Sequence, residues 1–315
     1  MSARRRTATT AAALLAAVAA SGCGVGYSGG GEGPLKGAKL TVGSKDFTEQ
    51  QVLGQITVQY LRAKGAAVND QTGLVSTDAV RRSLVNGDID LYWEYTGTSW
   101  ITFLGKPKPI ADPKKQFDAV AAEDLEQHGI VWIDPSTINN TYAFAIKRSR
   151  ARELGIRSLD DLPALLRRPE GQKLTFCVEA EFANRPDGFP GVQEAYGFSV
   201  PRNRVRRLDT GLIYSQTGNG SCSFGEIFTT DSRVASLDLL PLSDPRRFFP
   251  NYNAAVNVRE DVLRRWPVLR RLMKPIADRL DNATMQRLNA QVDNEGELPE
   301  KVARDWLVDQ RLIDD

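Results

Sequence analysis

The sequence predicts an α/β protein whose helices cover the faces of its sheets. Short apolar segments with strand patterning alternate along the chain with segments whose apolar residues recur at helical spacing. Signals made of Gly, Asn and Pro separate these segments. Of the 315 residues, 41% are hydrophobic, which is enough for one large domain or two ordinary ones.

The N-terminus is typical of an export signal, with a basic start at residues 4–6 and a short apolar run at residues 7–20. This run is too short for a stable membrane span. The sequence Ala20-Ser21-Gly22-Cys23 resembles a bacterial lipobox, although Leu is usual where Ala20 stands. Residues 1–23 are therefore expected to be a lipoprotein signal ending at a lipidated Cys23; an ordinary secretory signal with a free thiol is the alternative. Residues 24–37, which are rich in Gly, are predicted to be a flexible tether.

In the first half of the chain, Thr48 with Gln51 reads as a capping box that opens a helix, which Lys64-Gly65 closes. A second helix begins at Ser76-Thr77, and Asn86-Gly87 ends it. The predicted elements are a strand at 39–44, helices at 48–64 and 76–87, a strand at 89–95, a helix at 112–127 and a strand at 130–133.

In the second half, residues 139–147 alternate as a strand with Tyr142, Phe144 and Ile146 on one face. Ser158 starts a helix, and from Arg259 the pattern is helical to the end, interrupted by a turn at 293–298. The other predicted elements are strands at 174–178, 222–228 and 235–240 and a helix near 212–216.

Unusual residues fall where strands end, at Lys45, at Tyr95–Thr98 and at Phe228–Thr230. In open α/β sheets, ligands bind at the carboxyl ends of strands, beside helix N-termini. These positions predict one small-molecule site assembled from distant segments.

Several function classes are disfavoured by composition. The 41 basic residues are spread among 39 acidic ones, so no nucleic-acid-binding stripe is present and no nucleic-acid partner is expected. The single histidine, His128, argues against a Ser-His-Asp triad or a His-rich metal site. No nucleophile–base pair, cofactor fingerprint or phosphate-binding loop stands out. We therefore expect a protein that is not an enzyme, without catalytic residues, cofactor or metal. An enzyme using Glu179 or Glu181 as acid or base is the rival reading.

Export places Cys177 and Cys222 in oxidising surroundings, so a disulfide between them is expected, with two buried free thiols as the alternative. If the strands at 174–178 and 222–228 are neighbours, this bridge would stiffen the sheet that carries Phe228.

Six dispersed motifs then resemble a known family: GSKDFTEQQVLG, NGDIDLYWEYTGT, NNTYAFAI, EFANRPDG, FTTDSR and FFPNYNA. In this order and spacing they look like the osmoprotectant-binding proteins of ABC importers, which carry glycine betaine, choline, carnitine or proline betaine. The resemblance covers about residues 38–312. It implies a type II periplasmic-binding-protein fold, with the ligand held between two α/β lobes. Lobe I would comprise residues 38–138 and 251–315 and lobe II residues 139–250, with crossings near 136–140 and 249–253.

By matching motifs, the resemblance implies an aromatic cage of Tyr95, Tyr142, Phe228 and Tyr252 around a quaternary ammonium group. Such a cation has no N–H to donate, but the negative faces of aromatic rings attract it. The family usually has Tyr where this sequence has Phe228, which keeps the π face and loses the hydroxyl. Each ring taken singly reads better as a core residue, and only the set of four at the family's spacings favours a cage.

The resemblance also implies that Lys45, Thr98 and Arg185 hold the ligand carboxylate, to which they would offer a point charge, a hydroxyl and a planar fork. Taken alone, Lys45 and Arg185 also read as surface ion pairs. Asn140 lies where some relatives have an Asp near the cation. Asp88, Asp90 and Glu94 have no site role in this reading and are expected to form solvated or interlobe ion pairs.

The implied function is capture without chemistry, by a monomer outside the cytoplasm that is anchored to the membrane by lipid. Ligand binding would close the lobes, and the closed form would deliver a betaine to a membrane permease driven by an ATPase. A protein for choline or another solute, or a solute receptor that imports nothing, is the alternative.

Overall fold

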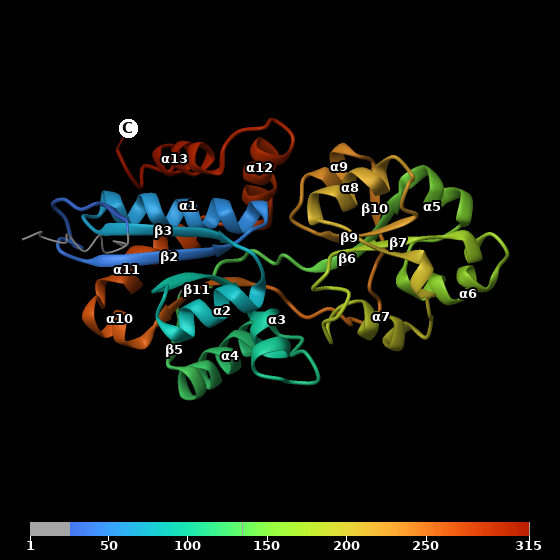
Figure 1. The fold of residues 1–315 in the computed structure, drawn as a ribbon, viewed down its shortest axis with the longest axis horizontal. Coiled ribbons are helices and arrows are strands. Elements are labelled where there is room, and N and C mark those ends of the chain that lie inside the picture. The colour runs from blue at the N-terminus through green and yellow to red at the C-terminus, as the bar shows by residue number, and fades with distance from the viewer. Residues whose placement is uncertain (1–25, 134, 315) are drawn as a thin grey trace, which may run out of the picture.

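The computed structural model describes residues 26–133 and 135–314, and the predicted signal peptide with Cys23 lies outside them. Two α/β lobes lie next to each other along the long axis of the molecule, each built on its own sheet (Figure 1). The predicted fold class is confirmed. None of the helices in the described ranges is both long and apolar enough to cross a membrane.

Lobe I is built on a six-stranded sheet in the order β1-β3-β2-β4-β11-β5. Strand β2 pairs in parallel with β3 and β4, whereas β11 is antiparallel to β4 and β5. Because β11 follows lobe II in the chain, lobe I is completed only when the chain returns. The strands are β1 (Tyr27–Gly29), β2 (Lys39–Lys45), β3 (Ala67–Leu74), β4 (Leu91–Tyr95), β5 (Ile130–Ile133) and β11 (Ala254–Arg259).

Lobe II is built on a five-stranded sheet in the order β10-β6-β9-β7-β8. Strand β7 pairs in parallel with β8 and β9, and β6 is antiparallel to β9 and β10. The strands are β6 (Tyr142–Lys147), β7 (Phe176–Val178), β8 (Val205–Arg207), β9 (Phe224–Phe228) and β10 (Leu239–Pro241).

Helices cover both sheets, and α2 begins and ends at the residues that local signals predict. The Ser76 hydroxyl accepts a hydrogen bond from Ala79 N at the start of α2, and Gly87 ends it in the left-handed conformation. The helices of lobe I are α1 (Thr48–Ala63), α2 (Thr77–Asn86), α3 (Thr96–Thr98) with a π-helical turn (Ser99–Phe103), α4 (Pro113–His128), α10 (Glu260–Arg265), α11 (Val268–Ala277), α12 (Asn282–Asp293) and α13 (Pro299–Asp309). Those of lobe II are α5 (Arg148–Leu154), α6 (Leu162–Arg167), α7 (Phe189–Tyr196), α8 (Thr210–Gly218) and α9 (Arg233–Ser236), with 3₁₀ turns at Leu159–Asp161, Gly171–Lys173 and Arg202–Arg204.

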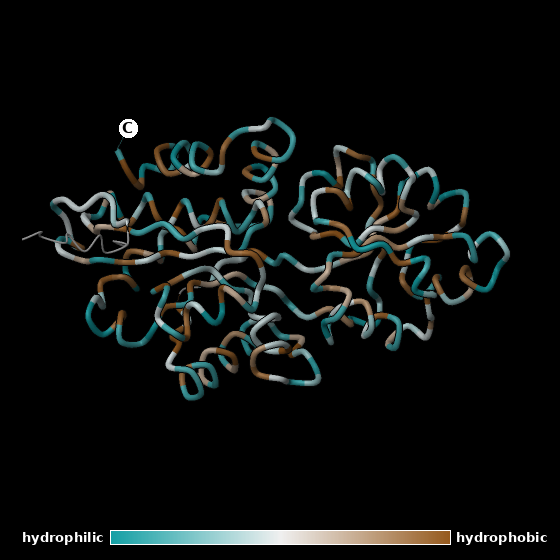
Figure 2. The backbone as a smooth tube through the Cα atoms, in the orientation of Figure 1, coloured by the Kyte–Doolittle hydropathy of each residue, from teal (hydrophilic) through white to brown (hydrophobic). Residues whose placement is uncertain are grey.

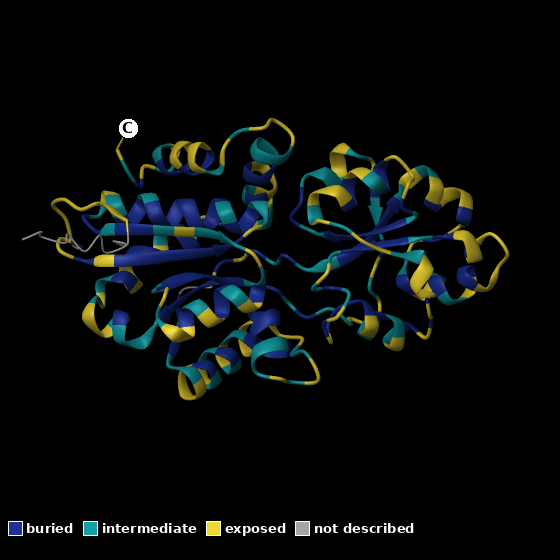
Figure 3. Cartoon of the chain, viewed as in Figure 1, coloured by how far each residue is buried: buried dark blue, intermediate teal, exposed yellow. Residues whose placement is uncertain are grey.

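The sheet of lobe I is buried on both faces (Figure 3). In β4, Leu91 and Trp93 point into the larger core, while Tyr92 points into a second core on the opposite face. Most residues of the central strands are buried in both lobes, and brown segments run through both sheets in Figure 2.

The chain crosses between the lobes twice, through the first crossing segment (residues 136–141) and the second crossing segment (residues 249–253). The two segments pair with each other: Asn139 bridges Asn253, and Asn140 N donates to Tyr252 O at 3.1 Å. The hinge between the lobes is therefore a two-stranded connection.

The structure corrects several local predictions. Thr48 is the first residue of α1 and not its cap; the cap position is Phe47, and the Thr48 hydroxyl donates to Asp293. Residues 24–37 are not wholly a free tether, because Tyr27–Gly29 pairs with β3 and Leu35 is fully buried. The predicted strand at 235–240 begins only at Leu239, after α9.

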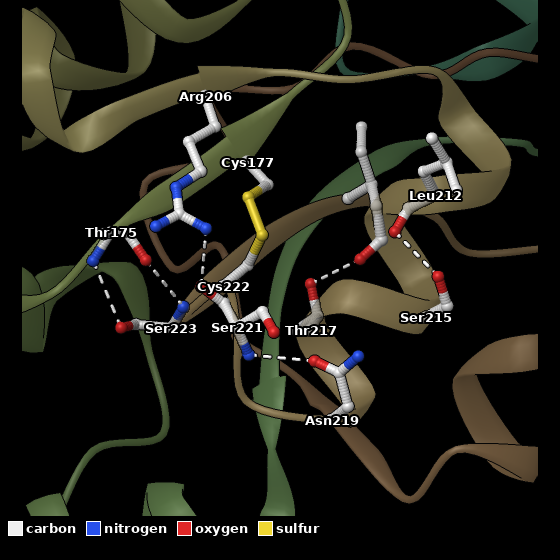
Figure 4. The surroundings of a disulfide bond; sticks show 11 residues. Thr175, Cys177, Arg206, Leu212, Ser215, Thr217, Asn219, Ser221, Cys222 and Ser223 are labelled. Atoms are coloured by element: carbon white, nitrogen blue, oxygen red, sulfur yellow. Dashed lines mark hydrogen bonds between the residues drawn. A yellow bond between two sulfur atoms is a disulfide. The ribbon is translucent and has the colours of Figure 1, made fainter.

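A disulfide joins Cys177 to Cys222, whose Cα atoms are 5.9 Å apart (Figure 4). Cys177 lies on β7, which pairs with β9, whereas Cys222 lies in the bend before β9 and not on the predicted strand. Thr175 and Ser223 exchange two hydrogen bonds of 3.1 Å beside the bridge. The disulfide thus ties the start of β9 to β7, and Phe228 is at the other end of β9.

Candidate functional site

A cavity of about 480 Å³ lies between the lobes. Its wall includes the four rings predicted to form the cage, together with the side chains of Lys45, Thr98 and Asn140. The four rings are those of Tyr95, Tyr142, Phe228 and Tyr252.

Three of these four rings belong to residues at the ends of strands. Tyr95 is the last residue of β4, Tyr142 the first of β6 and Phe228 the last of β9. Because β6 and β9 are antiparallel, Tyr142 and Phe228 are direct partners in the register. Tyr252 belongs to the second crossing segment, two residues before β11. Rings from both lobes and from the hinge therefore meet at one place.

The ring of Tyr142 is the centre of this group. Its centroid lies 5.1 Å from that of Phe228 and 5.2 Å from that of Tyr252, to which it is nearly perpendicular. A fifth ring that sequence reasoning missed, Phe47, stacks on Phe228 at 5.2 Å and on Tyr95 at 6.2 Å. Its place in the GSKDF motif, two residues after Lys45, was the available signal.

Lys45 is 4% exposed, and its ammonium donates to Glu94 at 2.7 Å. The same nitrogen lies 5.2 Å from the centroid of the Tyr95 ring. Glu94 is fully buried within lobe I and also accepts hydrogen bonds from Tyr92 Oη and Tyr95 N. The expectation that Glu94 is solvated or forms an interlobe pair was wrong, because its partners share its own lobe.

Asp88 and Asp90 lie outside the cavity. Asp88 is exposed, whereas the carboxylate of Asp90 accepts a hydrogen bond from Thr41 N at 2.8 Å within lobe I. Neither residue forms an interlobe ion pair among the residues that the structure describes.

Arg185 is 7% exposed and connects the lobes. Its guanidinium donates to both oxygens of Asp187, at 2.8 and 2.6 Å, and to Thr98 Oγ1 of lobe I at 3.4 Å. The guanidinium carbon is also 5.7 Å from the Tyr142 ring centroid. Asp187, which sequence reasoning missed, accepts the hydroxyl of Tyr252 at 2.6 Å and so joins this arginine to the group of rings.

Acidic side chains prevail around the rest of the cavity. Asp46, Glu179, Glu181 and Asp209 line it, whereas its lining cations, Lys45 and Arg233, each form an ion pair. Burial raises the pKa of Asp46 above its ordinary value, and the nearby charges of Glu181 and Asp209 add to the rise. Such a lining attracts cations.

Direct contacts hold the lobes together across the cavity. Glu181 of lobe II accepts Thr77 N, at the start of α2, at 2.7 Å. Arg233 of lobe II lies 3.3 Å from Asp293 of α12, and Asn289 of α12 donates to Thr230 O at 3.3 Å. Helix α12 is the part of lobe I that faces α8 and α9 in Figure 1. These contacts bridge the two lobes beside the cavity.

Two α/β lobes on a double crossing, with a cavity lined by aromatic and charged groups between them, define the class of two-lobed solute-binding proteins. The sequence model of the substrate-binding domain of ABC-type glycine betaine transport systems matches residues 38–309. The chain belongs to this family, which confirms the resemblance found in its motifs. The family is a class of transport proteins and not of enzymes.

Relatives match over most of this chain. The chain is 41% identical over 280 residues to a glycine-betaine-binding protein of Pseudomonas aeruginosa, covering 88% of this chain and 89% of that protein. It is 34% identical to the glycine betaine-binding protein YehZ of Escherichia coli, covering 87% and 92%. An ergothioneine transport permease/binding protein of Helicobacter pylori is 30% identical, and the match spans 85% of this chain and 47% of that protein.

Solved structures agree in fold. Apo YehZ from Escherichia coli superposes with a TM-score of 0.63 at 32% identity, over 87% of this chain and 99% of that chain. A glycine betaine/carnitine/choline ABC transporter structure gives a TM-score of 0.70 at 25% identity, over 87% and 100%.

Proposed function

We propose that this chain is the extracytoplasmic substrate-binding protein of an ABC importer and captures a quaternary-ammonium betaine between its lobes. The observation that carries the proposal is the convergence of Tyr95, Tyr142, Phe228 and Tyr252 on one interlobe cavity. Family membership supports the transport role.

The cage would bind the methylated head group. Each desolvated ring contact contributes roughly 0.5–2 kcal/mol, so three or four rings would supply several kcal/mol. Because the rings come from both lobes and the hinge, this energy is available only in the closed form, and ligand binding would shift the population toward closure.

The carboxylate of the ligand would lie near Arg185, Thr98 and Lys45, at the other side of Tyr142. Asp187 holds the guanidinium through Nε and one terminal nitrogen. The second terminal nitrogen of Arg185 is the donor that this arrangement leaves for a ligand oxygen.

The closed complex would dock on a membrane permease, and a separate subunit would hydrolyse ATP. Lipid attached to Cys23 would keep the monomer at the membrane surface. Docking on a permease extends the family's transport role. The lipid anchor rests on the lipobox-like sequence that ends at Cys23, which lies outside the described residues.

The proposal is tested by calorimetric titration of the purified protein with glycine betaine, proline betaine, carnitine, choline and ergothioneine, the last because of the Helicobacter relative's name. We expect a betaine to bind most tightly and to be recovered unchanged. Binding of none of these compounds would refute the proposal.

Tyr142→Leu is expected to lower affinity for the preferred betaine by about 30-fold, because a ring at the centre of the cage is replaced by a smaller aliphatic side chain without a π face. Tyr142→Phe keeps the ring and should change affinity less than about threefold. Tyr27→Ala, at an exposed ring outside the site, is the control. Equal losses in the Leu and Phe variants would contradict the cage.

Phe228→Tyr restores the residue usual in the family and should tighten binding of a trimethylammonium ligand by up to about threefold, since a phenol ring has the richer π face. Phe228→Leu should weaken it. Titrations of the two variants against the wild type measure this, and a weaker Tyr variant would show that the hydroxyl is not accommodated beside Phe47.

A choline-binding protein is the second candidate. Lys45 and Arg185 are each paired with a buried carboxylate, so the charge available to a ligand carboxylate is partly neutralised. A choline affinity well above that of every betaine would favour this candidate.

A further inference from the structure

Glu49 is a buried carboxylate directly behind the cage. It lies in the first turn of α1 and is 2% exposed. Its Oε1 accepts hydrogen bonds from Tyr95 Oη at 2.6 Å and from Asn140 Nδ2 at 3.0 Å, and Asn289 Nδ2 lies 3.5 Å from its Oε2. These neighbours, and Thr230, whose side chain also interacts with Glu49, are neutral.

No Lys or Arg side chain pairs with Glu49 in the described part of the chain. The nearest cations of the site have other partners: Lys45 pairs with Glu94, and Arg233 pairs with Asp231 and Asp293. A buried carboxylate without a cation is costly, and burial accordingly raises the pKa of Glu49 above its ordinary value, against the opposing effect of its hydrogen bonds.

The position of Glu49 relative to the rings is specific. A small cavity of about 10 Å³ is lined by Glu49 and by neighbours that include Asn140, Phe47 and Phe228. The ion pair of Arg233 with Asp231 lines it too. Asn140 and Phe228 also line the larger interlobe cavity. The carboxylate is therefore separated from the proposed head-group position by one layer of side chains, two of which it contacts directly.

We propose that Glu49 is the counter-charge for the ligand cation, and so determines the preference for a positively charged head group over a neutral one. This inference rests on the proposed function. The carboxylate acts through space and through the Tyr95 hydroxyl, whose hydrogen bond to Glu49 increases the electron density of that ring.

The test compares glycine betaine with tert-butylacetate, in which a carbon atom replaces the charged nitrogen and the shape is kept. Glu49→Gln should weaken glycine betaine about tenfold, because a buried charge one layer away is lost. The same variant should bind tert-butylacetate no more weakly than the wild type, since a repulsive carboxylate has been removed. Equal weakening of both ligands, or no change for glycine betaine, would overturn the inference.

A variant in which the carboxylate is moved from position 49 to position 140 separates the effect of charge from the effect of packing. In Glu49→Gln/Asn140→Asp the amide and carboxylate of one hydrogen-bonded pair are exchanged, so the preference for glycine betaine over tert-butylacetate should return to within about threefold of the wild type. Failure of this variant to regain the preference, with its thermal unfolding unchanged, would count against the charge role.

Glu123→Gln is the matched control, since Glu123 pairs with Lys106 at the surface, and it should leave both affinities unchanged. The proposed function and the inference fail separately. A wild type that binds no quaternary-ammonium ligand refutes both, whereas a wild type that binds glycine betaine, with the same preference over the isostere in Glu49→Gln, refutes only the role of Glu49.

Discussion

Arg185→Met is expected to lower affinity for glycine betaine by a factor of about 100 or more, because a buried charged hydrogen-bond donor to the carboxylate is lost. Choline has no carboxylate, so its affinity should fall much less. Titration of the variant with both ligands measures the difference. Parallel losses for the two ligands would show that Arg185 supports closure of the lobes through Thr98 and not the ligand carboxylate.

Among the described residues, the single variant also leaves the buried Asp187 with the Tyr252 hydroxyl as its one hydrogen-bond partner, which costs stability by roughly 3–5 kcal/mol. The double variant Arg185→Met/Asp187→Asn removes the unpaired acid and should recover most of this stability without recovering betaine affinity. Arg148→Met, which breaks an exposed pair with Asp238, is the matched control and should change neither quantity.

Removing the disulfide by Cys177→Ala/Cys222→Ala should lower the free energy of unfolding of lobe II by roughly 4 kcal/mol, from the entropy of closing a loop between residues 45 apart in sequence. Both cysteines are buried, so the alanines also leave small cavities that add to the loss. Denaturant unfolding followed by circular dichroism measures the change.

Wild-type protein unfolded in the presence of a reductant is the appropriate control, because it lacks the bridge and keeps both sulfur atoms in place. It should show most of the loss seen in the double variant. Unfolding midpoints that are the same for oxidised, reduced and variant protein would contradict a stabilising bridge. Betaine affinity at low temperature should be little changed, since Phe228 lies at the far end of β9 from Cys222.

Local patterns in the sequence predicted most helices and strands. Helix signals such as Ser76 and Gly87 act within a few residues, and the alternation in β4 directly reflects its two buried faces. Strand β3 was missed, because its sequence AVNDQTGL is polar and it is defined by main-chain pairing with β2 and β1. A strand of this kind carries little periodic signal.

The candidate site likewise has features that the sequence predicted and features that it did not. The sequence by itself determined the residue types at the strand ends, and its motifs pointed to seven site positions. Six of these line one cavity, and the seventh, Arg185, contacts Thr98 in its wall. Only the tertiary structure decided their partners: Glu94 for Lys45, 49 residues away, and Asn289 for Glu49, 240 residues away. The charge and hydrogen-bonding state of a buried group depends on whatever side chains packing brings within a few ångströms, and local sequence does not encode that distance.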